Sequence, residues 1–125
     1  MSNHVKKFYT AVSVLAGHGH IKQRLIKAFE DNLAHIEDDT MPSALRESFL
    51  DLSHLMNQVE PLNGEGPICA SVRKMSIDEA DECARRILDL YGDMVRVSIN
   101  TEAGEAIPLQ VEDRQVATPV LVNTN

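Results

Sequence analysis

The stretch "SIDEADECARRILDLYGDMV", residues 76–95, carries the clearest helical pattern in the chain. Ser76 and Glu79 match a capping box, in which the serine hydroxyl accepts from an amide and the glutamate reaches back to the serine amide. Acidic residues follow in the first turns, where negative charge favours the helix dipole. Apolar residues recur at steps of three and four: Ile77, Ala80, Ala84, Ile87, Tyr91 and Met94, with Leu88 and Val95 widening the stripe. We therefore expect a helix over about 76–96, buried along this stripe.

Three more helical patterns precede it, over about 3–16, 19–36 and 41–58. Their stripes are Val5, Phe8, Val12 and Leu15; Ile21, Leu25, Phe29, Leu33 and Ile36; and Leu45, Phe49, Leu52 and Met56. Gly17 fits the position just past a helix end, where a left-handed conformation suits glycine. Thr40 is the expected N-cap of the third helix, with Pro42 in its first turn.

The region after the third helix is less regular. Residues 59–67, "VEPLNGEGP", contain two prolines and two glycines and are expected to form a loop. The next stretch, "ICASVRKM", is compatible with a short strand or an irregular segment. Beyond the fourth helix the pattern is lost, and residues 98–125 are expected to be an irregular tail, either flexible or pairing with a sheet edge. Its segment Val116 to Val122 is a candidate docking peptide.

Composition supports an all-α fold, a small four-helix bundle formed by residues 1–97 as a single domain. The chain has 125 residues, enough for one domain with a core but too few for two ordinary ones. Hydrophobic residues make up 43% and aromatic residues only 4%. The core must therefore be aliphatic, which suits helix-on-helix packing better than a β-sandwich.

The formal net charge of −7 argues against nucleic acid or an anionic membrane as a partner, because such binders present a basic face. No run is long enough to span a membrane, and no secretion signal is clear. Cys69 and Cys83 form no zinc or redox motif. These features predict a cytosolic protein with reduced thiols.

The stretch Gly17-His18-Gly19-His20 has three readings. It could supply two ligands to a metal, although the other histidines and cysteines show no ligand spacing. It could bind an anion at a helix N-terminus, with Lys22 and Arg24 as further contacts. It could also be only the hinge between two helices, which is the commonest reason for glycine at such a place.

Two basic pairs are the candidate contacts for an acidic partner: Arg73 with Lys74, and Arg85 with Arg86. Arg85 and Arg86 each follow an acidic residue by four positions. Such pairs on a helix are ordinary surface interactions of roughly 0.3 kcal/mol each, so a solvated face explains them equally well.

No catalytic motif is present, and no cofactor or metal is expected. The pattern favours a small acidic protein-interaction module, an adaptor or regulator that is not catalytic and that could form a homodimer. One alternative is a module that binds a small ligand, metal or anion at Gly17–His20. A second is an enzyme assembled only in three dimensions, with His35 or His54 beside a carboxylate or Cys83.

Overall fold

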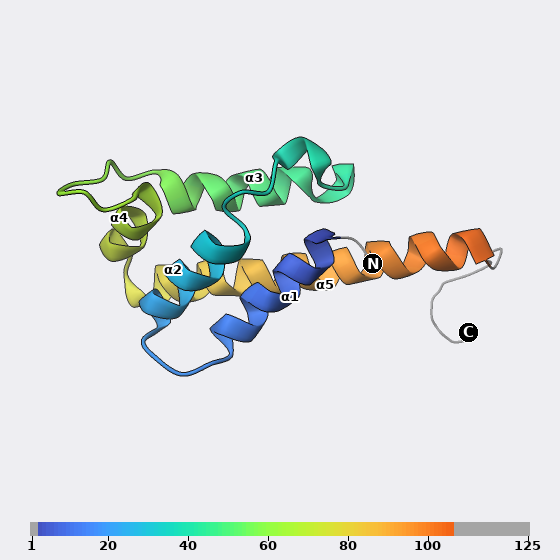
Figure 1. The fold of residues 1–125 in the computed structure, drawn as a ribbon, viewed down its shortest axis with the longest axis horizontal. Coiled ribbons are helices and arrows are strands. Elements are labelled where there is room, and N and C mark those ends of the chain that lie inside the picture. The colour runs from blue at the N-terminus through green and yellow to red at the C-terminus, as the bar shows by residue number, and fades with distance from the viewer. Residues whose placement is uncertain (1–2, 107–125) are drawn as a thin grey trace. The chain divides into compact units, whose positions relative to one another are not determined.

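The computed structural model describes residues 3–106, which contain α-helices and one 3₁₀ helix but no strand. The elements are α1 (Asn3–Leu15), α2 (Ile21–Asn32), η1 (Asp38–Thr40), α3 (Ser43–Asn57), α4 (Pro67–Lys74) and α5 (Ile77–Ala106) (Figure 1). Met1–Val95 form one compact unit, and α5 continues beyond its end. The expected docking peptide at residues 116–122 lies outside the described residues. The all-α prediction is confirmed.

The four-helix bundle is not confirmed, because the segment whose structure the sequence left open forms a fifth helix, α4. Pro67 occupies its first turn, where the missing N–H is no loss, and Arg73 and Lys74 lie in its last turn. Ile68 and Val72, four residues apart, are buried. The helix packs against both α3 and α2. Two turns are too short for helical periodicity to stand out in a sequence, and this explains the missed element.

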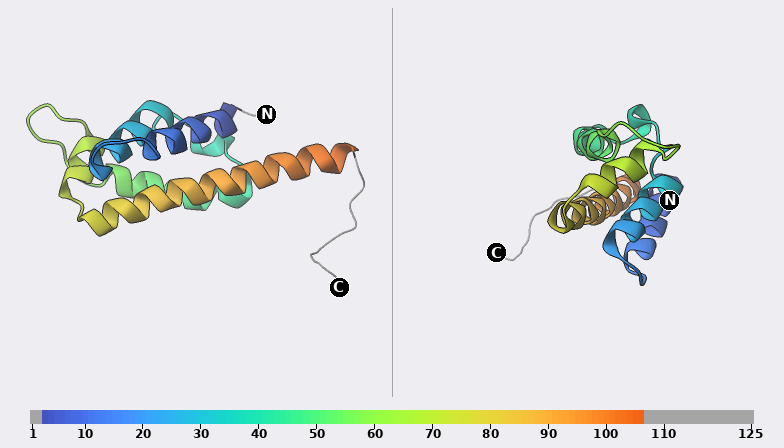
Figure 2. Two further views of the ribbon diagram at one scale, coloured as in Figure 1. Left: turned by 90° about the horizontal axis from the view of Figure 1, so that it is seen from below. Right: turned by 90° about the vertical axis from the view of Figure 1, so that its left-hand side faces the viewer.

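The core is formed by buried side chains from α1, α2, α3, α4 and the first half of α5. Helices α1 and α2 pack side by side as an antiparallel hairpin (Figures 1 and 2). Phe8 of α1 meets Phe49 of α3 edge to face, with ring centroids 6.2 Å apart. From α2, Leu25 and Phe29 are almost completely buried. The three phenylalanines are therefore all in the core, and most of the other core side chains are aliphatic.

Several expected helix boundaries are wrong. Helix α2 ends at Asn32 rather than near residue 36, although Leu33 and Ile36 are still buried in the turn that follows. Thr40 does not cap α3, since it ends η1 and its hydroxyl donates to the Glu37 carbonyl at 2.6 Å. The N-cap of α3 is Pro42.

The hinge between α1 and α2 also differs from expectation. Gly19, rather than Gly17, adopts the left-handed backbone, with φ of +111°. The local turn requires this conformation just before α2 begins. A side chain at position 19 would therefore strain the hinge whatever space surrounds it.

The buried stripe of α5 matches the expected one only in part. The buried residues are Ala80, Cys83, Ile87, Leu90 and Met94, of which Ala80, Ile87 and Met94 were predicted. Ile77 and Leu88, which we placed in the stripe, are each 52% exposed. Both stripes advance by three and four residues, so periodicity alone could not choose between them. Helix α5 also continues to Ala106, so residues 98–106, expected in the irregular tail, are helical.

Candidate functional site

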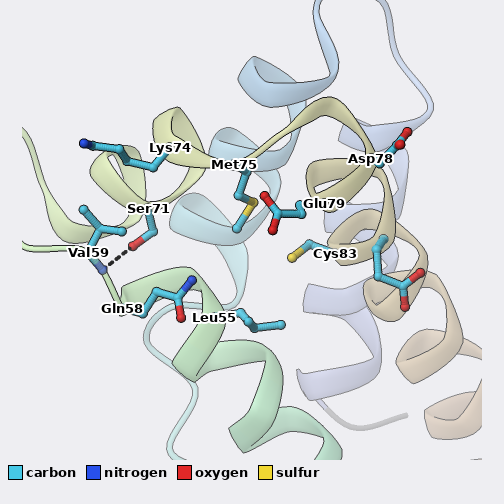
Figure 3. A pocket seen from close by; sticks show the side chains of 10 residues that line it. Leu55, Gln58, Val59, Ser71, Lys74, Met75, Asp78, Glu79 and Cys83 are labelled. Carbon is cyan, nitrogen blue, oxygen red and sulfur yellow. Dashed lines mark hydrogen bonds between the residues drawn. The ribbon is translucent and has the colours of Figure 1, made fainter.

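A surface pocket of about 360 Å³ opens where the end of α3, helix α4 and the start of α5 meet. Its lining residues are Leu55, Gln58, Val59, Ser71, Lys74, Met75, Asp78, Glu79, Glu82 and Cys83. Figure 3 shows the side chains of Met75, Glu79 and Cys83 turned toward its centre, with Lys74 and Asp78 at opposite edges. The pocket interior therefore combines the apolar or weakly polar side chains of Met75 and Cys83 with the Glu79 carboxylate, and its rim is charged. Its volume is in the range of sites that hold a small molecule or a partner's side chain.

The capping box predicted from the sequence builds one side of this pocket. The Glu79 amide donates to the Ser76 hydroxyl at 3.0 Å, and the Ser76 amide donates to the Glu79 carboxylate at 2.8 Å. This pair fixes where α5 begins, immediately after α4 ends. Asp78 and Glu82 are consequently held at the pocket rim, one helical turn apart.

A buried serine builds the opposite side. Ser71 of α4 is 1% exposed, and its hydroxyl accepts a hydrogen bond of 3.0 Å from the Val59 amide, just beyond α3. The bond ties the chain leaving α3 to the middle of α4 (Figure 3). Sequence analysis did not single out Ser71. No local signal would have done so, since its partner is twelve residues away in an irregular segment.

Cys83 lines the pocket, and the residue is 3% exposed. Burial raises the pKa of Cys83, although the nearby Arg86 guanidinium opposes this shift. The thiol is therefore protonated at neutral pH and is a poor nucleophile. His35 and His54 are exposed, and neither belongs to the described pocket lining. Cys83 therefore shares this pocket with carboxylates but with neither of the two histidines that the enzyme alternative named.

A second, smaller pocket of about 140 Å³ lies between the same two long helices. It is lined by Ser48 and Asp51 of α3 and by Arg86, Asp89, Leu90 and Asp93 of α5. Asp51 precedes Leu55 by four residues, and Glu82 precedes Arg86 by four. The two pockets therefore occupy successive turns of one face. We call the residues that line the two pockets the α3–α5 face.

The four basic residues predicted as partner contacts do not line the same pocket. Arg85 pairs with Asp81 at 3.2 Å and Arg86 pairs with Glu82 at 3.5 Å, the surface pairs that the spacing predicted. Lys74 lines the larger pocket and Arg86 the smaller one, whereas Arg73 and Arg85 line neither. Their role in binding stays a prediction.

Arg73 instead holds the loop before α4. Its guanidinium makes two contacts with the Glu65 carboxylate, at 2.6 and 3.2 Å. Glu65 also accepts a hydrogen bond from the Leu62 amide at 3.2 Å. The Arg73 guanidinium, and to a lesser extent the Leu62 amide, lower the pKa of Glu65. In the same loop, Asn63 and Gly64 both have positive φ, as in the tight turns that Asn-Gly favours.

The residues of the Gly17–His20 turn and their basic neighbours bond mainly to the protein itself. His20 is the N-cap of α2, and its Nδ1 accepts from the Lys22 amide at 3.1 Å. Arg24 donates to the Gly19 carbonyl at 2.9 Å and to the Leu15 carbonyl at the end of α1. The Lys22 ammonium donates to the Arg73 carbonyl at 3.2 Å, near the end of α4.

Of the four predicted ligand residues, His18 is exposed and makes no such bond to the part of the chain that the structure describes; it lies beside a shallow hollow of about 320 Å³. Lys27 and Arg24 also line this hollow. Among the described residues, no group of three or more histidines, cysteines or carboxylates is placed to hold a metal ion. The structure thus gives the turn a clear structural role as a capped hinge.

Comparison with protein families, with curated proteins and with solved structures finds no match for this chain. Within residues 3–106, no helix has the length and apolar character needed to cross a bilayer.

Proposed function

We propose that this protein is a small acidic adaptor or regulator, without catalytic activity, that binds another protein on its α3–α5 face. The observation that carries the proposal is the larger pocket, where Leu55, Met75 and Cys83 offer apolar surface next to the capped Glu79 carboxylate. Protein interfaces concentrate their binding energy in a few side chains that enter such pockets, surrounded by polar groups that exclude water. The charged rim formed by Asp78 and Glu82 fits this arrangement.

The chemistry of the same pocket supports binding rather than catalysis. The Cys83 thiol is kept protonated by burial. Glu79 is engaged at the helix start through the Ser76 amide, so using it as a base would require it to release a capping bond. Cys69 and Cys83 are both free cysteines, which suits the reducing cytosol that we propose as the location.

The rival site at Gly17–His20 has weaker geometric support. Main-chain carbonyls already hold the Lys22 ammonium and the Arg24 guanidinium, so an anion would have only their remaining N–H groups to bind. A thermal-shift series with Zn²⁺, Ni²⁺ and phosphate tests this rival directly, since a ligand that binds only the native state raises the melting temperature.

Site-directed photocrosslinking in cells tests the proposed function. A benzophenone amino acid is placed at Gln58, which is exposed and lines the larger pocket. The matched control places it at Asn57, the exposed neighbour that lines neither pocket of the α3–α5 face. We expect a discrete protein adduct from position 58 only. Equal adducts from both positions, or none from position 58, would contradict the proposal.

A further inference from the structure

We infer that the partner presents a basic amphipathic helix to the α3–α5 face, with one apolar side chain entering the pocket beside Cys83. This inference rests on the proposed function and adds the chemistry of the partner. It follows from the charge of the face, the spacing of its carboxylates and the position of the apolar pocket relative to them.

The α3–α5 face carries far more negative than positive charge. Its described lining contains six carboxylates and two cations: Asp51, Asp78, Glu79, Glu82, Asp89 and Asp93 against Lys74 and Arg86. Arg86 is already paired with Glu82. Within the described residues, Asp78 and Asp89 have no ion-pair partner. A partner that brings positive charge gains complementary potential and faster association, whereas an acidic partner is repelled.

Four of the carboxylates on α5 are also spaced so that they recur on one side of the helix. Asp78, Glu82, Asp89 and Asp93 are separated by four, seven and four residues, and so share one side of the helix. From Asp78 to Asp93 this side extends for about 22 Å, the length of a helix of about 15 residues. A partner helix lying along α5 would therefore meet carboxylates at both ends of its contact.

The apolar pocket fixes the orientation of that helix. Leu55, Met75 and Cys83 lie at the end where α5 begins, whereas the smaller pocket, one turn further along, is mainly acidic. A complementary segment therefore carries an apolar anchor flanked by lysine or arginine, with more basic residues one to three turns away. The anchor supplies apolar burial, and the charges select the partner.

Nuclear magnetic resonance titration of the full-length ¹⁵N-labelled protein provides the test. The probes are three synthetic peptides of about 18 residues, long enough to cover the face. The first has a leucine stripe and a lysine polar face. The second replaces every lysine with glutamate, and the third keeps the lysines but replaces every leucine with alanine.

Two charge-reversal variants are compared with the unaltered protein. The double variant Asp78→Lys/Asp89→Lys alters the face. The control, Asp31→Lys/Glu37→Lys, changes net charge by the same amount at exposed residues that line neither pocket. We expect the first peptide to bind and to shift resonances of Leu55 and Cys83. Binding should weaken roughly tenfold in the Asp78/Asp89 variant but much less in the control.

The remaining outcomes separate the two proposals. If the glutamate peptide binds at Leu55 and Cys83 as tightly as the lysine peptide, the face binds apolar anchors but the basic partner is wrong. If the alanine peptide binds equally well, non-specific charge attraction explains the result and the anchored helix is wrong. If neither leucine peptide shifts resonances of the face while the crosslink from position 58 persists, the proposed function survives and the helix is wrong. If the crosslink is absent as well, both fail.

Discussion

The buried hydroxyl of Ser71 accepts a hydrogen bond from the Val59 amide, with 3.0 Å between Oγ and N. Ser71 lies in the middle of α4, and Val59 lies just past the end of α3. Both residues line the larger pocket. This one bond therefore couples the stability of the α3–α4 connection to the shape of the proposed binding site.

Replacing Ser71 with alanine should lower the free energy of unfolding by about 1–3 kcal/mol, because the Val59 amide loses its partner in a partly buried place. Ser48→Ala, at an exposed serine of α3, is the control and should change it by less than about 0.5 kcal/mol. Chemical denaturation measures both values. Equal small losses would show that water replaces the bond without cost.

The Glu65–Arg73 pair predicts a component of stability that depends on pH. The folded protein lowers the pKa of Glu65, chiefly through the hydrogen bond from Arg73. The ionised carboxylate is therefore favoured by folding. Its contribution is complete above the pKa of the unfolded state and is lost as pH falls through the lower, folded value.

We expect Glu65→Gln to be less stable than the unaltered protein at neutral pH and to lose less stability on acidification to about pH 3. The effect should be small and sensitive to salt, since Arg73 is exposed to solvent. Denaturation curves for both proteins across this range provide the measurement. Parallel losses of stability would mean that other carboxylates account for the whole acid dependence.

The two histidines of the hinge should behave differently. His20→Ala removes the N-cap of α2 and should cost about 1 kcal/mol, whereas His20→Asn should retain most of the stability, because asparagine is a good N-cap. His18→Ala should change stability by less than about 0.5 kcal/mol, since His18 is exposed. Thermal and chemical denaturation of the three variants distinguish a capped hinge from a turn in which the histidines are equivalent.

Two adjacent residues of α5, both placed in the expected stripe, test which of them is in the core. Ile87→Ala removes a fully buried side chain and should lower the free energy of unfolding by about 2–5 kcal/mol. Leu88→Ala, at a side chain 52% exposed, should cost less than about 1 kcal/mol. A similarly large loss at Leu88 would show that this side chain is buried, as its place in the expected stripe predicted. Unfolding in denaturant, followed by circular dichroism, gives both numbers.

Local patterns in the sequence correctly predicted several features of the protein. The capping box at Ser76 and Glu79 and the ion pair from Asp81 to Arg85 are present as expected. The all-α class followed from repeated apolar stripes and a composition poor in aromatic residues. These features depend on residues within one helical turn of each other, or on totals over the chain, and such information does not require knowledge of the fold.

The features that the sequence did not predict depend on contacts between residues that are far apart in the chain. Periodicity could not choose between Leu88 and Leu90 for burial on α5, because only the helices packed against it distinguish the two sides. Lys22 reaches the Arg73 carbonyl across 51 residues, so a residue predicted as an anion contact supports the end of α4 instead. The acidic residues Asp78 and Glu82 were expected to favour the dipole of their own helix, and Glu82 also to pair with Arg86. They become the rim of a pocket because α3 and α4 place apolar side chains beside them, an arrangement that tertiary packing alone creates.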